Sequence, residues 1–215
     1  MARLRQLEVV GFGGAGVAAR AAARSAMPRG EVELVVDQDH YRRIVCDGML
    51  AAKVSLDVMT ADFKAMLVPA FGAVGGRGRR GRAPSIVEVF RTISQKGVEI
   101  RLLHAGTPSS MALKELRKAL PAGMTIRRCP RLHSKAVVVD CRAMYLGSAN
   151  LTGAGLGAKA DGRRNFEMGI WTESPALIDG VLEQFNALWE GRRCNTCRRK
   201  DVCPVPLEEP ALGGN

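Results

Sequence analysis

The sequence predicts an α/β fold, and two observations support this prediction. Strand-like and helix-like segments alternate through the middle of the chain, a pattern typical of α/β domains rather than of all-α or all-β ones. The chain has 215 residues, of which 47% are hydrophobic, which is enough for one substantial core. No run reaches the roughly 18 uncharged apolar residues that a membrane-spanning helix needs, so we expect no integral membrane association.

Two segments show the pattern of strands. Val54, Leu56 and Val58 alternate with polar residues, as on a half-buried strand. The run GVEIRLL, residues 97–103, is a second candidate. Both predict strands of one sheet.

Three segments show the pattern of helices. Ser85 and Glu88 stand at capping-box spacing ahead of an apolar stripe, and Gly97 follows as a stop signal. A further helix fits residues 109–120. The last helix is expected over residues 175–189, with a serine N-cap and a proline at its first helical position.

These elements divide the chain into three parts. Residues 1–36 form an Ala/Gly-rich N-terminal extension, residues 37–191 hold the folded domain, and residues 192–215 form a cysteine-rich tail. The first part contains Gly11, Gly13 and Gly16 in a GxGxxG pattern, but a dinucleotide-binding fold needs further βα units that the later sequence does not offer. We interpret these glycines as a turn or an arm.

The charge of the chain indicates a polyanionic partner. Lys and Arg total 32 against 21 acidic residues, for a net charge of +11, which favours nucleic acid first and phospholipid second. The segment GGRGRRGR at residues 75–82 can wrap a phosphate chain or serve as a solvated loop. Because aromatic residues are only 5% of the chain, we expect contact with the nucleic-acid backbone more than with bases.

Glycines and Glu8 interrupt the apolar stretch near the N-terminus, so it does not have the pattern of a secretion signal. We therefore expect a cytoplasmic protein.

The most informative segment is HSKAVVVDCRAMYLGSAN, residues 133–150, which reads His-x-Lys-x4-Asp-x6-Gly-Ser-x-Asn. Side chains alternate on a strand, so His133 and Lys135 share one face. A turn at residues 140–142 then lets a second strand return Ser148 and Asn150 to the same end. Phosphodiester hydrolysis needs an attacking group, a proton donor for the leaving oxygen, and donors to the remaining phosphate oxygens. This pattern supplies such groups without a metal.

The segment resembles the HKD motif of the phospholipase D superfamily, and all six motif residues are present. The similarity extends over about residues 40–190, including the later run NFEMGIW. It implies an α/β/α sandwich with a mixed sheet and one HKD motif per chain. It also implies that His133 attacks phosphorus to form a phosphohistidine, while Lys135 and Asn150 hold the phosphate oxygens.

The resemblance implies a role for Glu167, and we also expect roles for Asp140 and Ser148. Glu167 is similar to the acid that orients the catalytic histidine ring in this superfamily. Asp140 is expected to have a structural role at the turn, and Ser148 to bond either phosphate or backbone.

The mechanism of this superfamily uses two histidines, whereas this chain has one His-x-Lys pair. Neither His40 nor His104 begins a second pair. A two-fold axis through the site would bring His133 of two subunits together, so we expect a homodimer with one shared site.

The tail contains a C-x2-C-x5-C pattern that is typical of metal ligands. It is similar to part of the iron-sulfur site of RecB-type nucleases, which implies a structural 4Fe-4S cluster, and zinc is the main alternative. Redox-active or unliganded thiols are also consistent with the pattern. The expected ligands in the tail are Cys194, Cys197 and Cys203. The candidates for a fourth ligand, in order of preference, are Cys129, Cys46 and Cys141.

Three functions compete at this point. The first is a metal-independent nuclease acting on DNA or RNA. The second is a phospholipase D or phosphatidyltransferase, although no segment has the apolar and basic faces of an interfacial helix. The third is a non-catalytic nucleic-acid-binding module.

Overall fold

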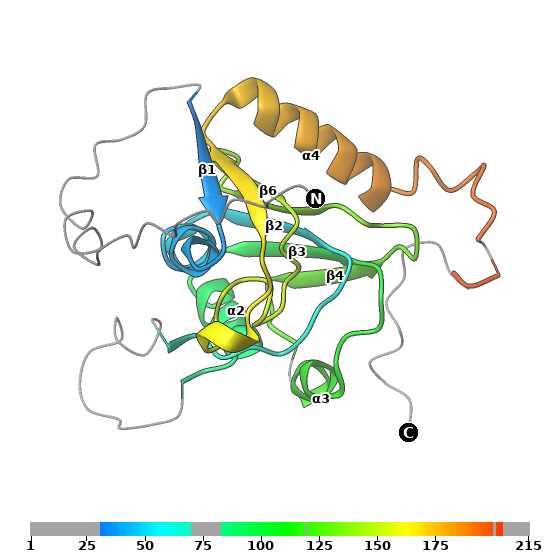
Figure 1. Ribbon diagram of the computed structural model, residues 1–215. Coiled ribbons are helices and arrows are strands. Elements are labelled where there is room, and N and C mark those ends of the chain that lie inside the picture. The colour runs from blue at the N-terminus through cyan, green and yellow to red at the C-terminus, as the bar shows by residue number, and fades with distance from the viewer. Residues whose placement is uncertain (1–30, 70–82, 119, 200, 204–215) are drawn as a thin grey trace, which may run out of the picture.

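The computed structural model describes residues 31–69, 83–118, 120–199 and 201–203, and these form a central sheet between two layers of helices (Figure 1). The predicted GxGxxG pattern and the arginine-rich segment 75–82 lie outside the described residues. Within the described residues, no helix is both long and apolar enough to cross a bilayer.

The sheet has seven strands in the order β1-β7-β6-β5-β2-β3-β4. Strands β2, β3 and β4 run parallel, and β5, β6, β7 and β1 continue the sheet with antiparallel pairs. The strands are β1 Val32–Val36, β2 Ser55–Thr60, β3 Glu99–His104, β4 Met124–Arg128, β5 Lys135–Val139, β6 Ala143–Gly147 and β7 Met168–Thr172. The prediction of an α/β fold with a mixed sheet is confirmed, as are strands within residues 54–58 and 97–103.

The sheet begins earlier than the expected start of the folded domain at residue 37. Strand β1 pairs with β7 through all five of its residues, from Val32 opposite Thr172 to Val36 opposite Met168. Val35 is buried in the core. Residues 32–36 therefore belong to the sheet and not to an extension.

Three α-helices flank the sheet, with shorter turns of helix between the strands. Helix α2 shows the predicted capping box, in which Ser85 Oγ accepts from the Glu88 amide and Glu88 Oε2 accepts from the Ser85 amide. Gly97 follows this helix with a φ of +93°, a conformation that favours glycine. The α-helices are α2 Ile86–Ser94, α3 Ser110–Lys118 and α4 Pro175–Trp189. The shorter elements are a π-helix η2 Tyr41–Cys46 and the 3-10 helices η3 Met49–Ala51 and η4 Asp161–Arg163.

Helices α2 and α3 cover one face of the sheet and α4 covers the other, which completes the predicted α/β/α sandwich (Figure 1). On the α4 face, Phe185 and Trp189 pack against the sheet in a small apolar cluster. Arg101 of β3 lies over the Phe185 ring at 4.7 Å and pairs with the buried Asp57 of β2 at 2.6 Å. These contacts fix α4 across the middle of the sheet.

The topology brings the ends of two strands and the starts of two others to the same side of the sheet. Strand β5 is antiparallel to both β2 and β6, so the start of β5 lies beside the ends of β2 and β6. The start of β7 lies there too, because Gly147 pairs with Gly169. We call this edge, formed by the ends of β2 and β6 and the starts of β5 and β7, the motif edge.

Candidate active site

Lys135 is the first residue of β5, and its ammonium group lies against His133. Its Nζ is 3.2 Å from His133 Nδ1 and 3.4 Å from Nε2, and it donates to the His133 carbonyl at 2.7 Å. Lys135 is only 7% exposed, whereas His133, just before the strand, is exposed. Burial lowers the pKa of Lys135, and the nearby carboxylate of Glu167 opposes this shift. The imidazole therefore faces solvent beside a buried cation.

Asn150 is held by the end of β2. Its side-chain oxygen accepts from the amides of Ala61 and Asp62, both at 3.1 Å, and from Thr60 Oγ1 at 3.3 Å. Thr60 in turn accepts from the Leu151 amide at 2.9 Å. Because the carbonyl oxygen of Asn150 is occupied, its Nδ2 is the group left to donate to a phosphate oxygen. The sequence did not single out Thr60, and only its position at a strand end could have indicated it.

Ser148 and Glu167 contact each other at the motif edge. Ser148 Oγ donates to Glu167 Oε2 and accepts from the Met168 amide at 3.0 Å. The other carboxylate oxygen of Glu167 accepts from Asn165 Nδ2 at 3.0 Å. The contacts of the described residues include no hydrogen bond between Glu167 and His133, so the role of Glu167 in orienting the ring stays a prediction.

Asp140 lies at the opposite edge of the sheet, in the turn between β5 and β6. Its carboxylate accepts from three consecutive amides ahead of and within β2, those of Lys53, Val54 and Ser55, at 2.7–3.1 Å. Asp140 has a φ of +53° and Cys141 a φ of +51°, so the turn uses the left-handed region. Asp140 is thus separated from the other motif side chains by the length of the strands.

A buried His40–Tyr145 pair supports the motif edge, and sequence reasoning missed it. His40 Nε2 lies 3.0 Å from the Tyr145 hydroxyl. This hydroxyl accepts at 3.2 Å from the amide of Ala149, the residue between Ser148 and Asn150. Burial lowers the pKa of His40 and raises the pKa of Tyr145 to about 12. The pair therefore connects η2 to the end of β6. Residues 37–43, DQDHYRR, are mostly polar, so no local pattern marks His40 as buried.

Only His133 among the three histidines of the chain is exposed. His40 and His104 are both 0% exposed. His104 Nδ1 lies 2.7 Å from the Gly106 carbonyl oxygen, and burial lowers its pKa. Neither buried ring is placed to reach a substrate from solvent, so one chain offers one accessible imidazole.

Three of the four predicted metal ligands border one cavity of about 300 Å³ between the segment before β5 and the end of α4. These are Cys129, Cys194 and Cys197; Cys203 does not line it. Within the described residues, no three His, Cys, Asp or Glu side chains gather closely enough to hold a metal ion. Cys141 lies in the Asp140 turn, at the opposite edge of the sheet from this cavity.

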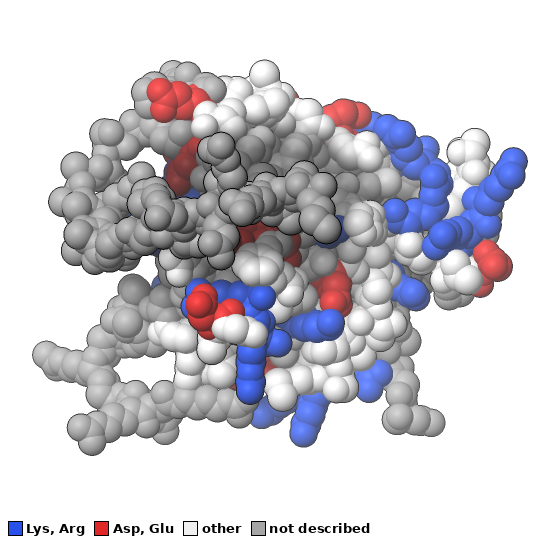
Figure 2. All heavy atoms as spheres, in the orientation of Figure 1, with Lys and Arg blue, Asp and Glu red and all other residues white. Residues whose placement is uncertain are grey.

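Basic side chains gather at the end of α4. Figure 2 shows Lys and Arg atoms over the segment that follows this helix. Arg193, Arg198 and Arg199 of that segment are exposed and form no ion pair with another described residue, whereas the exposed Arg192 pairs with Glu183 and Glu190. Arg193, Arg198 and Arg199 form the basic surface after α4. This surface is suited to an anionic ligand.

Comparison with known proteins places these features in a family. A family model described as "Cardiolipin synthase, PLD-like domain" matches residues 45–189. No curated protein matches the chain.

Solved structures share the fold. A phospholipase D family member, Nuc from Salmonella typhimurium, superposes with a TM-score of 0.55 at 19% identity over 74% of this chain and 94% of its own. NucT from Helicobacter pylori gives a TM-score of 0.53 at 12% identity over 74% of this chain and 96% of its own. At these identities the likeness concerns the fold alone.

Proposed function

The chain belongs to the phospholipase D-like family, and from that premise we propose that it is a metal-independent nuclease that hydrolyses phosphodiester bonds of DNA or RNA. The observation that carries the proposal is the exposed His133 imidazole beside the buried Lys135 ammonium, with Asn150 at the same edge of the sheet. The net charge of +11 and the basic surface after α4 favour a nucleic acid as the phosphodiester.

In the proposed reaction, an imidazole nitrogen of His133 forms a bond to phosphorus while the bond to the leaving oxygen breaks. A protonated second histidine gives its proton to that oxygen and then takes one from water, whose oxygen displaces His133 and releases the product phosphate. The Lys135 ammonium and the Asn150 amide stabilise charge on the remaining phosphate oxygens.

We propose that the second histidine is His133 of another subunit in a homodimer. The support is that His40 and His104 are fully buried and hydrogen-bonded within the fold, so neither is available as the proton donor. A two-fold axis beside the motif edge would bring two exposed imidazoles to one phosphate.

Cleavage assays test the nuclease. The full chain and His133→Ala are incubated with plasmid, single-stranded DNA and RNA in excess EDTA. We expect cleavage by the parent and a loss of at least about 10³-fold in the variant, because removal of a nucleophile abolishes the covalent step. Cleavage that survives in His133→Ala would contradict the proposal. Hydrolysis of phosphatidylglycerol vesicles without any cleavage of nucleic acid would favour the phospholipase alternative.

Mixing of subunits tests the shared site. Parent and His133→Ala chains are unfolded together in equal amounts and refolded, and the molar mass is measured by light scattering. If each site needs both histidines, about a quarter of the activity remains, whereas independent sites would leave about half. A monomeric mass, or a linear dependence of activity on the parent fraction, would exclude the shared site.

We also propose that the cysteine tail binds a structural metal, either a 4Fe-4S cluster or zinc, through Cys194, Cys197 and Cys203 with Cys129. The support is the C-x2-C-x5-C spacing, together with the packing of Cys129 and Cys194 against one apolar cluster. Metal binding would require the thiolates to move closer together than they lie in this structure. The reaction described above does not depend on this metal.

Elemental analysis of anaerobically purified protein tests the metal site. Four iron atoms per chain together with a broad absorption in the visible range indicate the cluster. One zinc ion per chain without that absorption indicates the alternative. Cys194→Ser with Cys197→Ser is expected to lose the metal, and Cys141→Ser, which changes an exposed cysteine at the far edge, is expected to retain it. Metal-free parent protein would refute the proposal.

A further inference from the structure

A cavity adjoins the candidate active site on the side of the C-terminal tail. It has a volume of about 300 Å³ and lies between residues 129–134, the second half of α4 and the start of the tail. Because its lining includes His133 and Ser134, it reaches the start of the catalytic strand. We call this space the lateral cavity.

The lateral cavity contains two cations that no carboxylate of the described residues neutralises. Arg131 and Arg193 line it, both are exposed, and the lining includes no Asp or Glu. Arg193 donates to Gln184 at 3.3 Å, and neither arginine takes part in an ion pair between described residues. The next arginine, Arg192, differs because it pairs with Glu183 and Glu190, both at 2.8 Å. The charge of the cavity therefore favours an anionic occupant.

The cavity also has an apolar wall. Leu132 is buried, Leu188 is half-buried, and both belong to the apolar cluster between α4 and the sheet. A space of about 300 Å³ is at the small end of the range for ligand pockets, so it suits a single nucleotide-sized group and excludes a duplex. An apolar wall with flanking cations matches the base or sugar and the phosphate of such a group.

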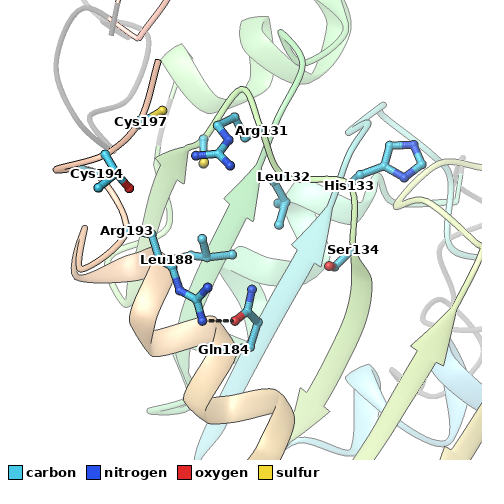
Figure 3. Close-up of a pocket in the computed structure, with 11 residues that line it drawn as sticks. Arg131, Leu132, His133, Ser134, Gln184, Leu188, Arg193, Cys194 and Cys197 are labelled. Atoms are coloured by element: carbon cyan, nitrogen blue, oxygen red, sulfur yellow. Dashed lines mark hydrogen bonds between the residues drawn. The ribbon is translucent and has the colours of Figure 1, made fainter. Parts of the chain in front are cut away.

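The His133 ring and the two arginines of the lateral cavity point in different directions. Figure 3 shows the His133 ring pointing away from Arg131 and Arg193, with Arg131 directed toward the tail at Cys194 and Cys197. The His133 ring thus points away from the cations of the lateral cavity, so a group bound in the cavity would lie beside a phosphate at the ring and not in its place.

We propose that the lateral cavity binds the nucleotide that adjoins the scissile phosphate, and that the enzyme consequently prefers single-stranded nucleic acid. Arg131 and Arg193 contact the phosphate of this nucleotide, while Leu132 and Leu188 contact its base or sugar. A base can enter such a space only when it is unstacked, which a single strand allows readily and a duplex allows only after unpairing. This inference rests on the proposed nuclease function and adds the form of its substrate.

The test compares arginine variants on three substrates. Arg131→Ala, Arg193→Ala and the double variant are compared with Arg192→Ala, a neighbouring charge that does not line the cavity. The substrates are an end-labelled single-stranded DNA, the same sequence as a duplex, and bis(p-nitrophenyl) phosphate, a small diester that carries no neighbouring nucleotide. Cys129, Cys194 and Cys197, the proposed metal ligands, also line the cavity. Circular dichroism therefore verifies that each variant is folded, and elemental analysis verifies that its metal content equals that of the parent.

We expect the parent to cut the single strand at least about tenfold faster than the duplex. Arg131→Ala and Arg193→Ala should each lower kcat/KM on the single strand by about tenfold, the loss typical of one charge-assisted contact. Neither variant should change hydrolysis of the small diester, and Arg192→Ala should stay within about twofold of the parent on every substrate.

The failures are distinguishable. If the parent cuts nucleic acid but Arg131→Ala and Arg193→Ala behave like Arg192→Ala, or if the duplex is cut as fast as the single strand, the lateral cavity is not a nucleotide site. If the parent hydrolyses the small diester through His133 but cuts no nucleic acid, the nuclease function and the cavity proposal fail together.

Discussion

The two ends of the β5–β6 hairpin hold residues of one sequence motif in different ways. At the motif edge, His133 is exposed beside the buried Lys135 ammonium, and the Asn150 carbonyl oxygen is fixed so that its amide nitrogen can donate. At the other end, Asp140 accepts from three backbone amides around the start of β2. The motif residues are thus divided between three that meet at the motif edge, where we propose the reaction, and Asp140, whose hydrogen bonds join the β5–β6 turn to the start of β2.

The contrast has a physical cause. A carboxylate that accepts several backbone amides has little capacity left for a substrate, and it stabilises the turn that it belongs to. The Lys135 ammonium has three donors, one of which goes to the His133 carbonyl, and in the proposed reaction the others bind the phosphate. Substitutions at the two ends should therefore affect different quantities, activity at one and stability at the other.

The largest effect is expected at Lys135. We expect Lys135→Met to lower kcat/KM on a phosphodiester by about 10²- to 10³-fold, as the loss of one positioned donor does. The free energy of unfolding should not fall, because burial of the charge is unfavourable and methionine has a similar length. Steady-state kinetics and thermal unfolding measure the two quantities. If Lys135→Met lost stability but kept its activity, Lys135 would have a structural role and not a role in the reaction.

The pH dependence gives a second measurement on the same residue. Burial lowers the pKa of Lys135, so activity should fall as pH rises through a value below the ordinary 10.5, where the ammonium loses its proton. In Lys135→Arg the guanidinium stays protonated, so the part of the alkaline loss that belongs to residue 135 should disappear, while any part that belongs to the proton-donating histidine should remain. An unchanged alkaline limb in Lys135→Arg would show that another group titrates there.

An intermediate effect is expected at Asp140, and on stability. Asp140→Ala should lower the free energy of unfolding by about 2 kcal/mol, because three amides lose a charged acceptor and alanine disfavours the left-handed φ. Activity per folded molecule should change by less than about threefold. Denaturant unfolding and kinetics on the same samples measure both quantities.

Asp140→Asn is the matched control for this prediction. Asparagine keeps one acceptor oxygen and tolerates a positive φ, so its stability should lie between those of the parent and Asp140→Ala. A large loss of kcat in Asp140→Asn with unchanged stability would indicate that Asp140 acts in catalysis.

The smallest effect is expected at His40, which supports the motif edge from inside. Burial lowers the pKa of His40 below 6.5, so the unfolded chain binds a proton first as pH falls. The free energy of unfolding should therefore not change near neutral pH. It should fall as pH drops below 6.5, and this one proton can lower it by at most about 1.4 kcal/mol per pH unit.

His40→Gln should have a shallower acid slope than the parent. The difference between the two slopes is the quantity to compare, because the buried His104 has a pKa lowered in the same direction and remains in both proteins. Chemical unfolding between pH 7 and pH 5 measures the slopes. Equal slopes would show that His40 does not titrate in this range.

Several features could be predicted because they depend on residues close together in the sequence. The capping box of Ser85 and Glu88, the helix that begins at Pro175 and the hairpin around Asp140 each need only a few neighbouring residues. One detail differed from expectation, since β5 begins at Lys135 and leaves His133 before the strand. Strand ends depend on pairing with neighbouring strands, which local pattern does not specify.

Other features could not be predicted because they depend on which distant segments pack together. Nothing near Thr60 in the sequence indicates a bond to Asn150, and nothing near His40 indicates one to Tyr145. Both contacts follow from the order of strands in the sheet and from the packing of η2 on it.

By itself, the sequence determined the α/β class, the motif and its hairpin, and the excess of positive charge, because composition and short-range spacing are properties of the chain alone. The tertiary structure decided that two of the three histidines are buried, that β1 belongs to the sheet, and that Arg131 and Arg193 border one cavity beside His133. These outcomes depend on long-range strand pairing and on apolar burial summed over the whole chain, and no local pattern encodes that sum.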